Sequence, residues 1–145
     1  MIRTVLAVTA VALGITAVAA QSDPIAARKA LMKANGDQAK IGAAMAKGEA
    51  PFDATKAQAI FTTFIDAATK MPALFPDNSK TGGDTAALPK IWESKADVDS
   101  RFAKFGAEAK AAQTAVKDLD TFKATWSNIV KNCGGCHENY RVKKS

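Results

Sequence analysis

Cys133, Gly134, Gly135, Cys136 and His137 lie close to the end of the chain and include both of its cysteines and its only histidine. C-x-x-C-H is the attachment sequence for a c-type haem. Its two thiols form thioethers with the haem vinyl groups, and its imidazole binds the iron as the proximal ligand. On a helix, spacings of three and four residues place these side chains on one face. The motif therefore predicts a C-terminal helix that carries one covalently attached haem c.

Other sites built from cysteine and histidine agree less well with this sequence. A structural zinc site needs four such ligands, and the chain has three. A thioredoxin-like C-x-x-C begins a helix that follows a strand, and no strand pattern precedes Cys133. A disulfide between the two cysteines would leave the adjacent His137 unexplained. A redox thiol pair or a disulfide remains the alternative to haem attachment.

The first twenty residues have the pattern of a secretory signal peptide. Arg3 supplies a positive charge, residues 4–20 are uncharged, and small residues allow cleavage after Ala19 or Ala20. The alternative is an uncleaved anchor, because about 17 apolar residues is the shortest length that spans a bilayer. We predict a signal peptide over residues 1–20 and one mature domain over residues 21–145, with no membrane span. Export agrees with haem attachment and predicts a periplasmic location.

The charge of the mature chain indicates which partners suit it. Without Arg3, nineteen basic residues outnumber fourteen acidic ones, which gives a net charge of +5. A mild positive charge favours encounter with an acidic redox partner protein. No block of like charge indicates nucleic-acid binding. Lys131, Arg141, Lys143 and Lys144 lie near the motif and form a candidate docking surface, or simply the basic end of a helix.

Apolar residues recur at helical spacing along the whole mature chain. Four helices are expected, over about 24–47, 54–71, 94–116 and 118–140. Asp23, Asp53 and Asp118 are the expected N-caps, and Gly48 ends the first helix. The first helix has an apolar stripe formed by Ile25, Leu31, Met32, Ala39 and Ile41. The fold class is therefore all-α, an antiparallel up-down-up-down four-helix bundle around one haem.

Residues 71–89 have no helical periodicity and are expected to form an ordered crossover loop. A short helical turn is expected near Ile91 and Trp92. The aromatic residues of the helices are expected to form core, and these are Phe61, Phe64, Phe102, Phe105, Phe122 and Trp126. Tyr140, one turn after His137, is the better candidate for contact with the haem.

The function depends on what faces the iron opposite His137. In an antiparallel bundle, His137 and Met32 each lie about 12 Å from the same end, so the two are level. A methionine thioether at that height would give His/Met coordination. Met45 lies about 20 Å further along its helix and is excluded, and Met71 is the weaker rival. The alternative is that Met32 packs without bonding, so that Leu31 covers an open iron.

The chain resembles the class II cytochromes c, which comprise cytochrome c′ and the low-spin c-556 type. The resemblance rests on the C-terminal C-x-x-C-H followed by Tyr140 and Arg141, on residues 28–36 (RKALMKANG) and on the GGD at 82–84. It implies that Met32 occupies the position of the distal residue, which is apolar in cytochrome c′ and a ligating methionine in the low-spin members. It also implies that Arg28 approaches a haem propionate and that Arg141 packs near the proximal histidine. A homodimer through the first two helices is compatible with it.

Two functions follow, and neither is enzymatic. If Met32 binds the iron, the protein is a periplasmic one-electron carrier with a low-spin haem. If Met32 does not bind, the protein is a cytochrome c′-like five-coordinate haem protein that binds nitric oxide or carbon monoxide. A peroxidase is disfavoured because the first helix offers no histidine for acid–base work.

Overall fold

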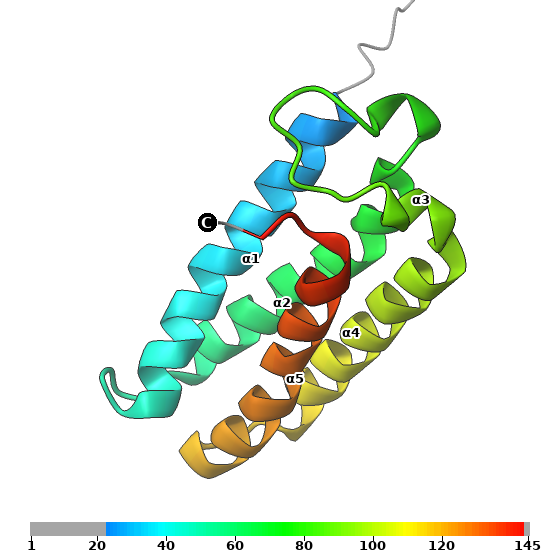
Figure 1. Cartoon of the computed structure of the whole chain (residues 1–145). Helices are drawn as coiled ribbons and strands as arrows, with labels where there is room; N and C mark the ends of the chain where they lie inside the picture. Colours follow the sequence, from blue (N-terminus) through cyan, green and yellow to red (C-terminus); the bar gives the residue numbers. More distant parts are fainter. Residues whose placement is uncertain (1–22, 144–145) are drawn as a thin grey trace, which may run out of the picture.

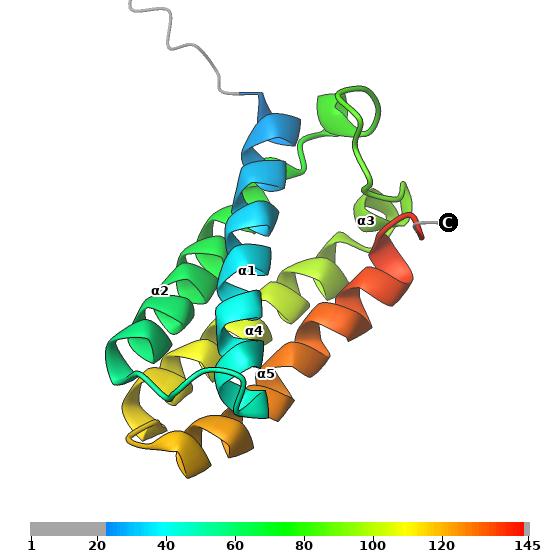
Figure 2. The same cartoon turned by 90° about the vertical axis from the view of Figure 1, so that its left-hand side faces the viewer.

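Four long helices pack side by side in alternating directions, and they confirm the predicted four-helix bundle (Figures 1 and 2). The computed structural model describes residues 23–143, so the predicted signal peptide lies outside the described residues. The long helices are α1 (Pro24–Lys47), α2 (Ala54–Lys70), α4 (Lys95–Ala115) and α5 (Leu119–Tyr140). Helix α1 contacts α2 and α5, and α4 also contacts both, so α2 lies diagonal to α5. Within residues 23–143, no helix is both long enough and apolar enough to cross a bilayer.

The helix ends follow the capping residues that the sequence contains. The Asp23 carboxylate accepts a hydrogen bond from the Ile25 N–H at 2.9 Å, and Gly48 ends α1 with a φ of 78°. Asp118 and Thr121 form a reciprocal capping box at the start of α5. These contacts satisfy N–H groups that a helix terminus otherwise leaves without partners. The predicted bounds of the four helices are therefore confirmed to within one or two residues.

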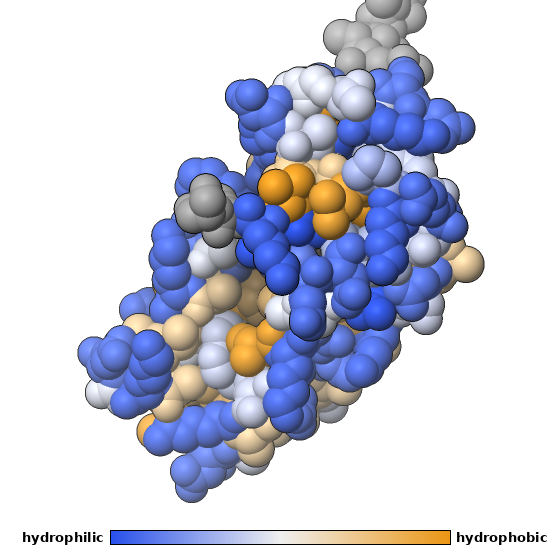
Figure 3. Space-filling view, viewed as in Figure 1, coloured by the Kyte–Doolittle hydropathy of each residue, from blue (hydrophilic) through white to orange (hydrophobic). Residues whose placement is uncertain are grey.

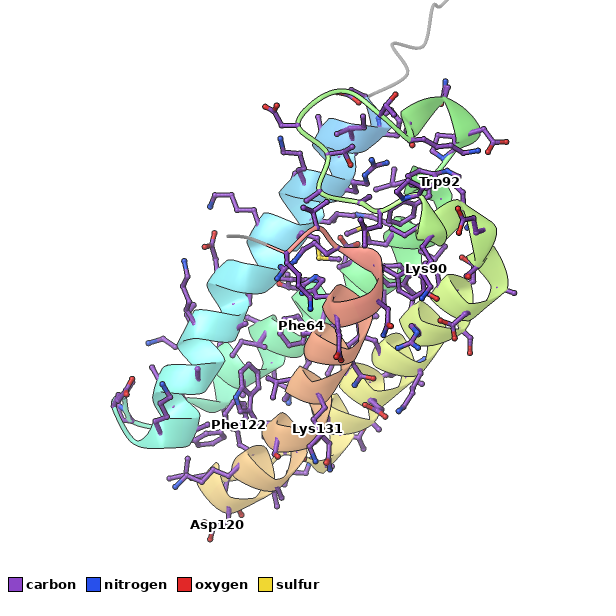
Figure 4. The ribbon with its side chains drawn as sticks, in the orientation of Figure 1. Phe64, Lys90, Trp92, Asp120, Phe122 and Lys131 are labelled. Atoms are coloured by element: carbon purple, nitrogen blue, oxygen red, sulfur yellow. The ribbon has the colours of Figure 1, made fainter. Side chains whose placement is uncertain are left out.

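The core is divided into two clusters along the bundle axis. The lower cluster is centred on aromatic residues of α2 and α5, among them Phe61, Phe64 and Phe122. The upper cluster joins Met71, Phe102 and residues of the crossover loop. In Figure 4, Phe122 lies towards the lower end of the bundle and Trp92 lies at the upper end. The six aromatic residues predicted as core are all buried.

The apolar stripe predicted for the first helix is partly wrong. Ile41 is 39% exposed, whereas Met45 is 1% exposed within the lower cluster. Gly42 is also buried, and the ring of Trp126 lies directly against it. Helix α1 is therefore rotated so that Gly42 and Met45 face the core. Glycine has no apolar side chain, so the spacing of apolar residues does not predict its burial.

Residues 71–93 form the expected crossover and contain three short turns. These are η1 (Met71–Leu74), η2 (Asp77–Ser79) and α3 (Lys90–Glu93). The crossover also pairs with the chain after α5, because Leu88 N–H donates to the Tyr140 carbonyl at 3.0 Å and Val142 N–H donates to the Ala86 carbonyl at 2.8 Å. This pairing fixes the end of the helix that carries the C-x-x-C-H motif.

Candidate haem-binding site

A large, partly open cavity lies between α1, α4, α5 and the crossover, and its lining extends along α4 and α5 toward the lower end of the bundle. Its volume is about 1080 Å³, just above the range of about 300–1,000 Å³ typical of small-molecule sites. Figure 3 shows apolar atoms lying deeper than the hydrophilic side chains around them on the face that α1 and α5 present. An apolar recess of this size is suited to a large, flat, mostly apolar group.

The three residues of the motif all line this cavity from α5. Cys133, Cys136 and His137 are each partly buried, and both cysteines are free thiols. Burial raises the pKa of the Cys133 thiol, and it raises the pKa of the Cys136 thiol despite the opposing charge of Arg101. Burial also lowers the pKa of His137, and the charge of Arg141 lowers it further. A neutral imidazole has the free lone pair that an iron ligand needs.

Helix α1 forms the wall that faces the motif. Met32, Asn35, Gly36 and Ala39 line the cavity from this helix. The Oδ1 atom of Asn35 is buried and has no hydrogen-bond partner among the described residues. Such an atom normally has a hydrogen-bond partner. The side-chain oxygen of Asn35 is therefore still available to accept a hydrogen bond at the cavity wall. The small side chains at positions 36 and 39 leave room for a planar group against α1. The residues present therefore fit a haem bound through Cys133, Cys136 and His137.

Two methionines share the cavity with His137. Met32 is partly buried on α1, the helix adjacent to α5, and it packs at the edge of the upper cluster. Met71 also lines the cavity, but it is 1% exposed and lies within the upper cluster. Met45 lies in the lower cluster, which agrees with its exclusion as a ligand. Met32 is therefore less deeply buried than Met71.

Tyr140, Arg141 and Arg28 also line the cavity. Tyr140 is 5% exposed, and its hydroxyl donates to Asp97 Oδ2 at 2.5 Å. Arg141 is exposed at the end of α5, where its backbone forms a β-bridge with Ala87. These positions allow contact of Tyr140 and Arg141 with a haem.

Arg28 has a second role that the sequence did not indicate. Its guanidinium donates to the Leu74 carbonyl at 3.0 Å, to Ser79 Oγ at 2.9 Å, to the Ser79 carbonyl at 2.8 Å and to Thr85 Oγ1 at 2.6 Å. Four of its five N–H donors are thus bonded to the crossover. Burial lowers the pKa of Arg28, and the Asp23 carboxylate opposes this effect. Arg28 holds the crossover onto α1, and its approach to a propionate stays a prediction.

Sequence reasoning missed one residue of the site, Arg101 on α4. Its Nη1 donates to the carbonyl oxygen of Gly135, inside the motif, at 3.2 Å, and its Nε donates to Asp97 Oδ2 at 2.6 Å. The i, i+4 spacing of Asp97 and Arg101 indicates an ion pair on a helix surface. The spacing of charges along α4 alone does not show that α5 brings the motif next to Arg101.

Comparisons with known proteins agree on one family. A family model described as "Cytochrome C′" matches residues 23–141. A cytochrome c′ of Rhodopseudomonas palustris is 51% identical over 93% of this chain and 92% of its own length. A cytochrome c-556 of the same organism is 38% identical over 99% of both chains. The solved structure of a Rhodopseudomonas palustris cytochrome c′ superposes with a TM-score of 0.83 at 52% identity, over 86% of this chain and 100% of that one.

Proposed function

The chain belongs to the cytochrome c′ family of class II cytochromes c, and from this membership we propose that it is a one-electron carrier whose iron is bound by His137 and Met32. Its cofactor is one covalently attached haem c, held through Cys133, Cys136 and His137. The proteins of this family are haem proteins and not enzymes. When bound, the haem supplies a one-electron couple between ferric and ferrous iron.

The observation that carries this proposal is the position of Met32 in the same cavity as His137. The two side chains come from adjacent antiparallel helices, so they can approach one group from opposite sides. A thioether is a soft ligand that favours ferrous iron, and His/Met coordination is the arrangement of electron-carrying cytochromes c. An iron with both axial positions filled needs little rearrangement when it gains or loses an electron.

A second candidate function is supported by the comparisons. The identity to a cytochrome c′ is 51%, against 38% to a cytochrome c-556, and similarity over the whole chain therefore favours the cytochrome c′ type. In that case Met32 would leave the iron five-coordinate and open to nitric oxide or carbon monoxide. We place more weight on Met32 because this one side chain decides the coordination, whereas overall identity is spread over the entire bundle.

The replacement of Met32 by leucine separates the two functions. We expect the wild-type protein to be low-spin in both oxidation states, with a sulfur-to-iron charge-transfer band when oxidised. Met32→Leu should be high-spin and five-coordinate and should bind carbon monoxide readily. Absorption spectra of the oxidised and reduced holoproteins, with and without carbon monoxide, provide the measurement.

Met71→Leu is the matched control, because Met71 lines the same cavity. Its spectrum should remain that of the wild type. A high-spin wild-type spectrum at neutral pH would establish the second candidate instead. A low-spin spectrum that Met71→Leu abolishes, and Met32→Leu does not, would make Met71 the ligand.

The proposed setting is the periplasm, with a signal peptide removed after Ala19 or Ala20. The partner is an acidic redox protein that docks near the haem. Lys131 and Arg141 are exposed at the cavity wall, and Figure 4 places Lys131 on α5. Lys143 is exposed beyond the helix, whereas Lys144 lies outside the described residues. A homodimer through α1 and α2 belongs to the same proposal.

A further inference from the structure

Arg101 is the cationic side chain of α4 that bonds directly to the haem-attachment motif. Its Nη1 donates to the Gly135 carbonyl oxygen at 3.2 Å, and the Asn139 amide donates to the same oxygen at 3.0 Å. The Arg101 side chain is 39% exposed, and it also lines the cavity. It therefore lies between solvent and the haem site, in contact with the turn that separates the two cysteines.

A small network holds the guanidinium in this position. Arg101 Nε donates to Asp97 Oδ2 at 2.6 Å, and that oxygen also accepts the Tyr140 hydroxyl hydrogen bond. The guanidinium carbon lies 5.6 Å from the centroid of the Tyr140 ring, within the range of a cation–π contact. Arg101 is thus fixed on one side by its own helix and on the other by the last turns of α5.

The network also determines which charge of the ion pair faces the cavity. Arg101 lines the cavity, whereas its partner Asp97 does not. The positive member of the ion pair is therefore the one that faces the haem site. A fixed positive charge beside a haem favours the ferrous form, because that form carries one unit less positive charge. Charge and hydrogen bonding around a haem are among the protein's means of setting its potential.

We propose that Arg101 is a positioning residue that holds the attachment turn through Gly135 and directs a positive charge at the haem, which raises its reduction potential. The inference rests on the proposed electron-carrier function, since a carrier is selected for its potential. It does not depend on which residue fills the sixth position of the iron.

The test is the midpoint potential of holoprotein variants at low ionic strength. Arg101→Gln should shift the potential to a more negative value. The matched control is Lys104→Gln, because Lys104 also lines the cavity from α4 but is 69% exposed and, within residues 23–143, forms an ion pair with Glu108 alone, at 3.7 Å. The control should shift the potential in the same direction and by clearly less. Equal shifts in the two variants would overturn the proposal.

Arg101→Lys separates position from charge. Lysine keeps the positive charge but lacks the rigid fork that bonds Asp97 and Gly135 together. Its potential should lie between those of the wild type and Arg101→Gln. A wild-type potential would overturn the positioning role, and a potential equal to that of Arg101→Gln would overturn the role of charge. If Arg101→Gln does not incorporate haem, Arg101→Lys still tests the proposal.

The salt dependence and the spectrum complete the test. High ionic strength screens a partly exposed charge, so the gap between wild type and Arg101→Gln should narrow as salt is added. A gap that salt does not change would contradict the electrostatic origin. The axial-ligand spectrum is recorded in parallel: a high-spin wild type would refute the carrier proposal, whereas the potentials would still decide the role of Arg101.

Discussion

At the scale of single residues, Gly42 shows how closely α1 can approach the core. A Cβ atom at this position would lie 2.3–2.8 Å from three carbons of the Trp126 ring. That ring stacks on Phe122 and on Phe64, so it has little room to move. We predict that Gly42→Ala destabilises the protein despite the gain in helix propensity of about 1 kcal/mol. Overpacking a core costs about 1–3 kcal/mol, so the net loss should reach up to about 2 kcal/mol.

Denaturant unfolding of the holoproteins measures this loss, and a double-mutant cycle identifies its cause. In a Trp126→Phe background the smaller ring leaves more space, so Gly42→Ala should cost less than in the wild type. Additive effects of the two substitutions would show that the cost arises elsewhere, because residues in direct contact normally couple.

Single residues were also where the sequence was least informative. The motif residues could be predicted, because C-x-x-C-H contains its own chemistry within five positions. Ile41 and Gly42 could not, because the rotation of α1 depends on the shape of the Trp126 ring across the bundle. The same holds for Arg28 and Arg101, because their partners in the crossover and in the motif lie 34 to 57 positions away.

At the scale of elements, the start of α5 depends on Asp118. Hydrogen bonds from the backbone and side chain of Thr121 hold the pKa of Asp118 below its ordinary value. A carboxyl whose pKa is lower in the folded state stabilises that state above its unfolded pKa. This contribution is lost as the pH falls through the folded pKa. The helix cap should therefore weaken in acid.

Asp118→Asn tests this sign. Asparagine caps a helix about as well as aspartate but does not titrate in this range. The difference in unfolding midpoint between wild type and variant should change between about pH 6 and about pH 3, with the wild type losing more. Asp120→Asn, which removes an equal charge from the first turn without removing the cap, is the control. Identical pH profiles for wild type and Asp118→Asn would contradict the prediction.

The bounds of the helices could be predicted because their caps act over short distances in the sequence. Asp23, Asp53 and Asp118 act through bonds to residues two or three positions away, so a local pattern determines them. The 3₁₀ turns η1 and η2 were not predicted. They depend on Arg28 and on other contacts from distant elements, which a local pattern does not contain.

At the scale of the whole molecule, the core is divided between a lower cluster that packs largely on itself and an upper cluster whose buried residues all line the cavity. The centre of the lower cluster, around Phe61 and Phe122, lies away from the cavity, although Phe64 and Phe105 reach its wall. The upper half depends on what fills a volume of about 1080 Å³. Without a cofactor, the apolar walls of this recess lose the packing contacts and the burial that a large apolar group would supply.

We therefore predict that preventing haem attachment loosens the upper half selectively. In a Cys133→Ala, Cys136→Ala double variant made without haem, the cavity walls must close or take in water. Amide hydrogen exchange should speed up in the last turns of α5 and in residues 71–93, while the middle of α2 keeps most of its protection. The lower cluster thus serves as the internal reference within the same sample. Equal loss of protection along all four helices would show that the two halves unfold as one unit, and unchanged protection near Cys136 would show that the cavity does not need an occupant.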